Sequence, residues 1–221
     1  MYLSLLQLNP ASAAVQRDLR DVADLHRTIM RAFPEILDPE VEARAYYGVL
    51  HRLEFQRAGG RVMLYVQSAV KPDWSQLPVD YLAPDDGVRL KTVDEVYAGL
   101  REGRVLRFRL RANPTRKVDT KSGPDGARLN GRRVPVGGLE EQILWLARKA
   151  DQHGFALLQA SVAASGSPEK AKSYRPGRTF QGVVFEGRLA VRDPAQFREA
   201  LARGIRPGKA FGFGLLSVGP E

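Results

Sequence analysis

The 221-residue sequence contains no cysteine. This absence excludes disulfide bonds, thiolate metal sites and a cysteine nucleophile, and it is consistent with a reducing compartment. No apolar run approaches the ~20 residues that a membrane-spanning helix needs, and residues 1–20 lack the apolar centre of a signal peptide. We therefore expect a cytoplasmic protein that makes no membrane contact.

Motifs of several enzyme classes are also missing. The chain has no pair of carboxylates at metal-ligand spacing, no His-x-x-x-His pair and no Gly-x-Ser-x-Gly sequence. Lys209 lies in a glycine-rich run but is not followed by serine or threonine, which argues against a nucleotide-binding P-loop. We therefore expect neither a metal ion nor another cofactor.

Negative charge is scarce in two stretches of the second half. The net charge is +9, yet residues 1–103 carry −3, whereas residues 104–133 carry +8 and residues 170–221 carry +6. Such concentrated basic stretches indicate a surface for a polyanion, most often a nucleic acid. A generally basic, solvated protein remains the alternative.

The missing metal motifs limit the chemistry available if the polyanion is RNA and is cleaved. Without a metal, the ribose 2′-hydroxyl attacks the adjacent phosphate, which is possible in RNA and not in DNA. A base must accept the 2′ proton, an acid must protonate the leaving 5′ oxygen, and cations must stabilise the phosphorane charge. One histidine fills one of the proton-transfer roles, worth roughly 10²–10⁴-fold in rate.

Hydrophobic patterning predicts a β-α-β-β-α-β unit in the first half. Alternating residues predict the strands, and an apolar stripe predicts a first helix with Asp21 as a candidate break. A capping box at Thr92 and Glu95 predicts a second helix that stops at Gly103. The predicted elements are strand 2–8, helix 12–33, strands 46–57 and 61–70, helix 92–103 and strand 104–111.

The second half repeats this order. The predicted elements are strand 133–136, helix 139–152, strands 155–162 and 182–190, helix 193–204 and strand 211–218. We therefore expect an α+β protein with two tandem ferredoxin-like (βαββαβ) domains, each with an antiparallel sheet. The domains are expected at residues 1–118 and 133–221, joined by a basic linker at residues 119–132.

His26 is the candidate catalytic residue. It follows Leu25, which lies on the apolar stripe of the first helix, and precedes Arg27 on the polar face, so it lies at the margin of the stripe. A lone helical histidine is more often structural or merely solvated, and this alternative stays open. His51 alternates with apolar residues on one strand face and is expected to be packed or at a sheet margin rather than catalytic.

Four basic or glycine-rich elements are expected to bind RNA. The strand 104–111 places three arginines on one face, the linker and the hairpin 170–178 are basic, and the run 204–214 has glycines whose amides can cradle phosphate. A solvated loop is the alternative for the hairpin. The candidate RNA-binding residues are Arg107, Arg109, Arg111, Arg116, Lys117, Arg128, Arg132, Arg133, Lys170, Lys172, Arg175, Arg178, Gly208, Lys209, Gly212 and Gly214.

Several short motifs occur together along most of the chain. They are MYLS at 1–4, Leu25-His26, FRLRANP at 108–114, RVP at 133–135, VFEGRL at 184–189 and GIxPGKAxGxGLLS at 204–217. By these residues the chain resembles the CasE family, the CRISPR-associated endoribonucleases of Cascade-type systems within the RAMP superfamily. FRLRANP followed by the terminal PGKAxGxGLLS is the most specific part of this resemblance.

The resemblance implies two tandem ferredoxin-like domains that bind the stem-loop of a CRISPR repeat transcript. It implies metal-independent cleavage at the 3′ base of the stem, which leaves a 2′,3′-cyclic phosphate and a 5′-hydroxyl. The crRNA product typically stays bound, and the protein becomes a Cascade subunit. His26 occupies the position of the family's catalytic histidine, and the Lys170–Arg178 hairpin matches the basic element that enters the major groove of the stem.

One departure from the family pattern concerns Ala23, because relatives often carry a tyrosine three residues before the histidine. Either His26 works with another group, with Arg27 as the nearest cationic candidate, or turnover is slow, which is tolerable when each molecule cuts once. Two other functions remain open. The protein could be a non-catalytic RNA-binding scaffold subunit of a CRISPR effector complex, or a basic housekeeping RNA-binding protein.

Overall fold

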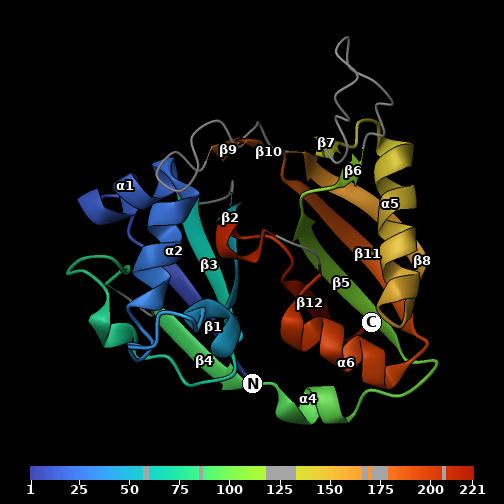
Figure 1. Ribbon diagram of the computed structural model, residues 1–221, viewed down its shortest axis with the longest axis horizontal. Helices are drawn as coiled ribbons and strands as arrows, with labels where there is room; N and C mark the ends of the chain where they lie inside the picture. The colour runs from blue at the N-terminus through green and yellow to red at the C-terminus, as the bar shows by residue number, and fades with distance from the viewer. Residues whose placement is uncertain (57–59, 85–86, 118–132, 166–168, 171–178, 206–207) are drawn as a thin grey trace.

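The computed structural model describes residues 1–56, 60–84, 87–117, 133–165, 169–170, 179–205 and 208–221. Two four-stranded antiparallel sheets lie side by side (Figure 1), with strand orders β2-β3-β1-β4 and β12-β5-β11-β8. Within each sheet the first strand of the unit lies between its third and fourth strands. This is the strand order of a ferredoxin-like unit, so the predicted α+β class with two such units is confirmed.

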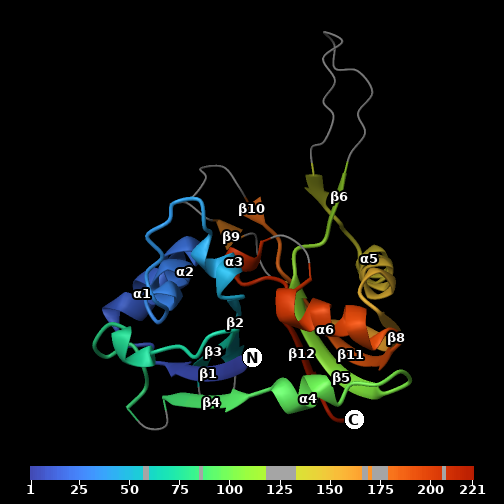
Figure 2. The same cartoon turned by 60° about the horizontal axis from the view of Figure 1, so that its bottom comes forward.

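The first unit is built on β1, whose residues pair on both sides with antiparallel neighbours. Its helices α1 and α2 lie on one face of the sheet (Figure 2) and bury a core that includes Leu6, Ile29 and Val66. Its elements are β1 (Tyr2–Leu8), α1 (Ala13–Arg20), α2 (Val22–Met30), α3 (Ala43–Tyr46), β2 (Leu50–Gln56), β3 (Arg61–Ser68), the 3-10 turn η2 (Trp74–Gln76) and β4 (Val88–Thr92).

The predicted first helix is two helices that meet at Asp21, the candidate break. Asp21 has extended backbone angles, φ −142° and ψ 115°, which no helix interior tolerates. Its carboxylate accepts a hydrogen bond from the Ala23 amide at 2.9 Å and so caps the first turn of α2. This cap sets the direction in which α2 presents His26.

The second unit packs α5 and α6 on one face of its sheet, where Trp145 stacks on Phe185 and Phe155 contacts Phe197. Its elements are α4 (Asp94–Ala98), β5 (Val105–Ala112), α5 (Leu139–Gln152), β8 (Phe155–Ser165), β11 (Val183–Val191), α6 (Pro194–Arg203), the 3-10 turn η3 (Lys209–Phe211) and β12 (Leu216–Gly219). Two small hairpins accompany it, β6 (Thr115–Lys117) with β7 (Arg133–Pro135), and β9 (Glu169–Lys170) with β10 (Thr179–Phe180).

The expectation that strand 104–111 completes the first sheet is wrong. That strand is β5, which lies in the second sheet between β11 and β12, with Arg109 opposite both Glu186 and Ser217. The first sheet is completed instead by β4, an edge strand whose residues are all exposed. Its five residues alternate apolar Val88 and Leu90 with basic Arg89 and Lys91, but this alternation is short, and the longer pattern of β5 was assigned in its place.

The expected domain boundary after residue 118 therefore falls beyond the first strand of the second sheet. The chain changes sheet between Thr92 and Val105, and the predicted second helix is only the five-residue α4 in this connection. We place the division between the units there. The predicted linker 119–132 lies outside the described residues.

Two further strand predictions need correction. Residues 133–135 pair with β6 in a separate hairpin and are not the first strand of the second sheet. The final strand begins only at Leu216, because Gly212 and Gly214 have φ values of +78° and +91° that a strand does not accommodate. No helix within the described ranges has the length and apolar character needed to cross a membrane.

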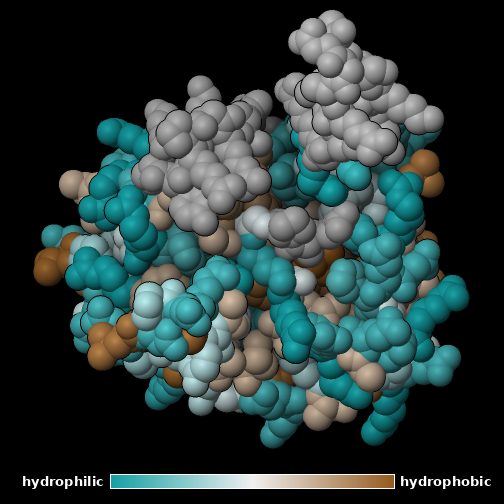
Figure 3. Space-filling model, in the orientation of Figure 1, coloured by the Kyte–Doolittle hydropathy of each residue, from teal (hydrophilic) through white to brown (hydrophobic). Residues whose placement is uncertain are grey.

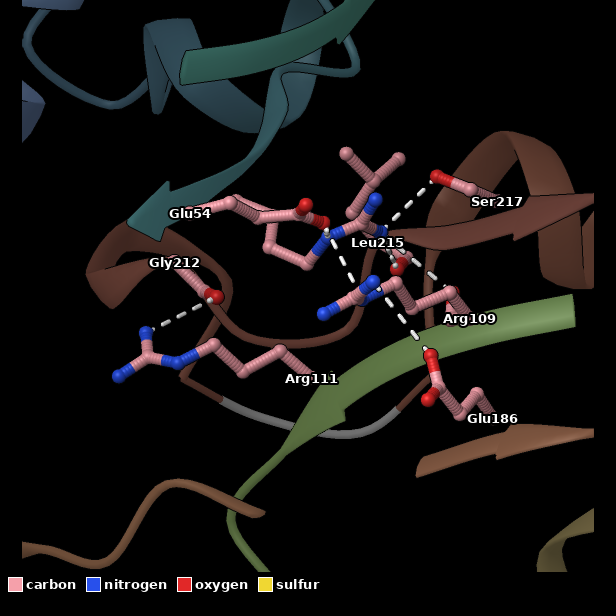
Figure 4. Close-up of polar contacts among 8 residues, drawn as sticks. Glu54, Arg109, Arg111, Glu186, Gly212, Leu215 and Ser217 are labelled. Carbon is pink, nitrogen blue, oxygen red and sulfur yellow. Dashed lines mark hydrogen bonds and ion pairs between the residues drawn. The ribbon is translucent and has the colours of Figure 1, made fainter. Parts of the chain in front are cut away.

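A buried guanidinium joins the two units. Arg52 of β2, 2% exposed, donates from Nη1 to the Ser217 hydroxyl at 2.9 Å and to the Leu215 carbonyl at 3.3 Å, both in the second unit. Its Nε contacts Glu54 at 2.7 Å, and Glu54 also lies 3.3 Å from Arg109. Arg109 in turn contacts Glu186 at 3.4 Å (Figure 4), so one chain of charges runs from the first sheet to the second.

We predict that Arg52→Ala lowers the free energy of unfolding by about 3–5 kcal/mol, because it leaves a partly buried carboxylate and two acceptors of the second unit without their donor. Urea denaturation followed by circular dichroism measures the loss. Arg101→Ala, at an exposed position, is the control and should change stability by less than about 0.5 kcal/mol. Equal stability of the two variants would contradict the joining role of Arg52.

Candidate active-site cleft

A cleft of about 1640 Å³ opens between the two units. The first unit contributes residues of α2 and α3 to its walls, and the second contributes α6, η3 and the end of α5. The charged and imidazole side chains along the cleft are His26, Arg27, Glu42, Arg44, His153, Glu199, Arg203 and Lys209. The structure thus brings His26, Arg27, Gly208 and Lys209, four of the residues singled out from the sequence, to one place.

His26 is half-buried at the edge of the apolar face of α2, as its margin position predicts. Its ring stacks on the ring of His51 from β2, with the centroids 6.2 Å apart and the planes 15° from parallel. His26 Nδ1 is buried and has no hydrogen-bond partner in the described part of the chain. The imidazole is therefore held by packing on one side and meets the cleft on the other.

The surroundings of His26 keep its imidazole neutral. Burial, with the positive charge of Arg44 as a second cause, lowers the pKa of His26 from 6.5 to about 4, and Glu42 opposes this shift. At neutral pH the ring therefore has a free lone pair. A neutral imidazole at the wall of a cleft can accept a proton from a bound hydroxyl.

His51 is packed, as predicted, with 1% of its surface exposed. Burial, followed by the charges of His26, Arg111 and Arg44, keeps the pKa of His51 well below its usual value. Neither ring nitrogen has a hydrogen-bond partner among the described residues. The ring of His51 packs against the ring of His26 and is a second neutral imidazole, buried in the interior.

The glycine-rich run is shaped by close contacts within the protein. A Cβ atom on Gly212 would lie 3.2 Å from Arg111 Nη1 and 3.4 Å from His51 Nε2, and the φ of +78° disfavours any side chain there. The amides of Gly212 and Gly214 donate to the carbonyls of Lys209 and Arg111. These two amides are therefore not available for the predicted phosphate cradle, whereas Gly208 and Lys209 line the cleft.

Ala23, the departure from the family pattern, is buried in an aromatic cluster. Phe180 of β10, Phe211 of η3 and Phe213 pack around it, with the ring of Phe180 4.8 Å from Phe211 and 5.7 Å from Phe213. The space beside Ala23 is thus filled by rings from the second unit. None of these rings carries a hydroxyl that could replace a tyrosine in proton transfer.

Arg27 lies at the rim of the cleft. Its guanidinium pairs with Asp24 on the same helix, and 69% of its side chain is exposed. Its predicted catalytic role requires the guanidinium to exchange this partner for substrate.

The three strand arginines share one face of β5, and that face meets other parts of the protein. Arg109 pairs with Glu54 and Glu186, and Arg107 donates to the Pro220 carbonyl at 2.9 Å. Arg111 lies over the Phe213 ring at 4.6 Å and donates to the Gly212 carbonyl (Figure 4). Glu54 could not be located beside Arg109 from the sequence because it lies on β2 of the other unit, whereas Glu186 lies opposite Arg109 on the neighbouring strand β11.

The remaining predicted RNA-binding residues either lie away from the cleft or fall outside the residues that the structure describes. Arg116, Lys117 and Arg133 are exposed on the β6–β7 hairpin. The backbone of Lys170 in β9 pairs with that of Thr179 in β10. Arg128, Arg132, Lys172, Arg175 and Arg178 lie outside the described residues.

Sequence reasoning missed Arg44 and Glu42, which come from the short helix α3 and the residue before it. They lie in what looks like an acidic connector, and only the fold brings that connector to His26. The face of the molecule in Figure 3 is largely hydrophilic over α6, with smaller apolar groups beside it. Within the described ranges, no group of three His, Asp or Glu side chains is arranged to hold a metal ion.

Comparison with known proteins relates the whole chain to one family. The family model described as "CRISPR associated protein" matches residues 1–220. The chain is 35% identical to CRISPR-associated endoribonuclease Cse3 of Thermus thermophilus over 231 residues, covering 100% of both chains. It is 30% identical to the CRISPR system Cascade subunit CasE of Escherichia coli K12 over 203 residues, covering 91% of this chain and 93% of the relative.

Among solved structures, the fold matches Thermus thermophilus Cse3 bound to an RNA representing a pre-cleavage complex. The TM-score is 0.78 at 34% identity, and the match covers 99% of this chain and 98% of the other. The two-unit architecture is therefore shared along the full length.

We predict that stability falls as the pH drops below about 6.5. Both histidines have lowered pKa values when folded, so the unfolded state binds more protons between about pH 6.5 and the folded pKa. In that range each histidine lowers the free energy of unfolding by at most about 1.4 kcal/mol for every pH unit of acidification. Above about pH 6.5 this loss is absent. Urea denaturation from pH 7.5 to 5 measures the slope.

The control for this pH dependence is the double variant His26→Gln with His51→Gln, which should have a clearly smaller slope. A slope identical to that of the unmodified protein would show that other groups bind the protons.

We also predict that Ala23→Tyr destabilises the fold, because the added ring overpacks the aromatic cluster. The expected loss is about 1–3 kcal/mol in the free energy of unfolding. Ala13→Tyr, at an exposed position of α1, is the matched control and should cost less than about 0.5 kcal/mol. A stable Ala23→Tyr variant would mean that the cluster has room for a tyrosine.

Proposed function

This chain belongs to the CRISPR-associated Cse3/CasE endoribonuclease family, and on that premise we propose that it binds the stem-loop of a CRISPR repeat transcript and cleaves it. Cleavage takes place at the 3′ base of the stem and gives a 2′,3′-cyclic phosphate and a 5′-hydroxyl. The protein then stays bound to the crRNA as a Cascade subunit. The observation that carries the proposal is the neutral imidazole of His26 at the wall of a cation-lined cleft.

In the proposed reaction His26 is the general base. With a pKa of about 4 it is unprotonated at neutral pH and accepts the proton of the ribose 2′-hydroxyl. The 2′ oxygen attacks the adjacent phosphorus, and the bond to the 5′ oxygen breaks. Arg27, the next residue on α2, is the cation that sequence reasoning assigns to this step.

The base of the basic hairpin supports binding of a stem next to His26. Phe180 of β10 packs on Ala23, which lies about one turn before His26 on α2. The backbone of β10 pairs with that of β9. The paired strands β9 and β10 therefore lie beside the cleft, because Phe180 packs on Ala23 and Phe211, which line it. We expect a stem bound by the basic residues of the sequence between these two strands to have its end close to the imidazole, which fits cleavage at the stem base.

Two relatives support the choice of RNA and assembly. The E. coli relative is named a Cascade subunit, and the T. thermophilus Cse3 structure is described with bound RNA. Retention of the product is compatible with slow turnover, because one cut per molecule suffices.

A non-catalytic RNA-binding scaffold is the second candidate function. The observation that favours it is Ala23, whose surroundings contain phenylalanine rings and no phenol. Both functions require RNA binding, and only cleavage separates them.

The test is cleavage of a repeat stem-loop RNA in EDTA under single-turnover conditions. The protein should cut this RNA and should not cut the same RNA with a 2′-deoxy group at the scissile nucleotide. His26→Ala should reduce the rate by roughly 10²–10⁴-fold while affinity for the uncleavable RNA stays within a few-fold.

Arg31→Ala, an exposed change at the end of α2, is the control and should cut at the normal rate. Full activity of His26→Ala would remove His26 from the mechanism. An intact stem-loop with the unmodified protein would favour the scaffold.

A further inference from the structure

The cationic side chains that line the cleft outnumber the carboxylates that line it. Arg203 pairs with Glu199 at 3.1 Å, and Arg44 pairs with Glu42 at 3.1 Å. Lys209 lines the same space and has no ion-pair partner among the described residues. Like charges held together in a partly buried cleft are unfavourable unless an anion binds between them. The excess charge therefore indicates an anion site.

Arg44 is the cation with the most restricted position in this cleft. Its side chain is 14% exposed, its Nε contacts Glu42, and its Nη1 donates to the Val49 carbonyl at 3.4 Å. A guanidinium fixed in this way loses little freedom when a ligand binds. Arg27, by contrast, is 69% exposed and pairs with Asp24 on its own helix.

Arg44 lines the same cleft as His26 and Lys209, and Glu42 and Arg203 line it too. The ring of His51 stacks on that of His26. Burial is the first cause of the lowered pKa of His26, of His51 and of Lys209, and the positive charge of Arg44 is a further cause in each.

We propose that Arg44 is a catalytic residue that contacts the non-bridging oxygens of the scissile phosphate, with the ammonium of Lys209 as the second cation. This inference rests on the proposed function and assigns the phosphate-binding group of the same site. Arg44 takes the role for which the sequence offered Arg27 as the nearest cationic candidate. The planar guanidinium suits two phosphate oxygens at once.

Arg44 transfers no proton in this step. The 2′ proton goes to His26, the bond between the 2′ oxygen and phosphorus forms, and the bond between phosphorus and the 5′ oxygen breaks. Water supplies a proton to the 5′ oxygen, and the imidazolium returns its proton to the hydroxide formed. Arg44 and Lys209 stabilise the additional negative charge on the phosphorane oxygens, where fixed cations are most effective.

The test compares Arg44→Gln with the unmodified full-length protein on a repeat stem-loop RNA. Single-turnover cleavage should slow by about 10²–10³-fold, while affinity for the 2′-deoxy RNA stays within about threefold. Arg44→Lys, which keeps the charge without the planar fork, should have an intermediate rate. Circular dichroism melting establishes that both variants are folded.

Two readouts separate phosphate contact from a structural role. Sulfur at one non-bridging oxygen of the scissile phosphate should slow the unmodified protein more for one diastereomer than for the other, and Arg44→Gln should lose this difference. The pKa that defines the acidic limb of the pH profile of kcat/KM should be higher in Arg44→Gln, because the positive charge of Arg44 helps to lower the pKa of His26.

Arg101→Gln, an exposed charge change, is the matched control and should leave the rate unchanged. Equal rates and equal sulfur effects for Arg44→Gln and the unmodified protein would overturn the assignment of Arg44 and leave the proposed function intact. Failure of the unmodified protein to cleave would overturn both.

Discussion

The relative placement of the two units depends on one buried cation, the guanidinium of Arg52. Arg52 lies on the outermost strand of the first sheet, and burial of a guanidinium is tolerated only when its donors and its charge are satisfied. Glu54 supplies the charge, and the Leu215 carbonyl and the Ser217 hydroxyl of the second unit supply acceptors. These contacts have directions, so they fix how the sheets sit beside each other. The cleft exists because α2 and α3 then face α6 and η3 at a set distance.

The chemistry of the cleft follows from this burial. Two imidazoles stacked at 6.2 Å, one of them fully enclosed, are kept neutral by lost hydration and by nearby guanidinium groups. A neutral base beside fixed cations is a suitable pair for removing a proton next to a phosphate. The same arrangement makes the fold sensitive to acid, because protonating either ring puts a charge in a poorly hydrated place, fully enclosed for His51 and half-buried for His26.

Much of the fold follows from local patterns. The helix 139–152, the hairpin of β2 with β3 and the strands β8 and β11 were predicted from periodicity and turn residues, and the structure has them nearly as predicted. The error came at β4, an exposed edge strand of five residues whose alternation is shorter than that of β5, so that β5 was assigned to the wrong sheet. Strand pairing over long separations leaves little trace in a single strand's residues.

The sequence by itself determined the two α+β units, the margin position of His26 and the concentration of basic residues, because periodicity and charge are local properties. Only the tertiary structure decided which groups surround the imidazole. Arg44 comes from a connector, His51 from a strand, and Lys209 from a loop more than a hundred residues away in the order of the chain. The pKa of His26 and the enclosure of Ala23 by phenylalanine rings depend on burial and distance, and these arise only when separate segments pack together.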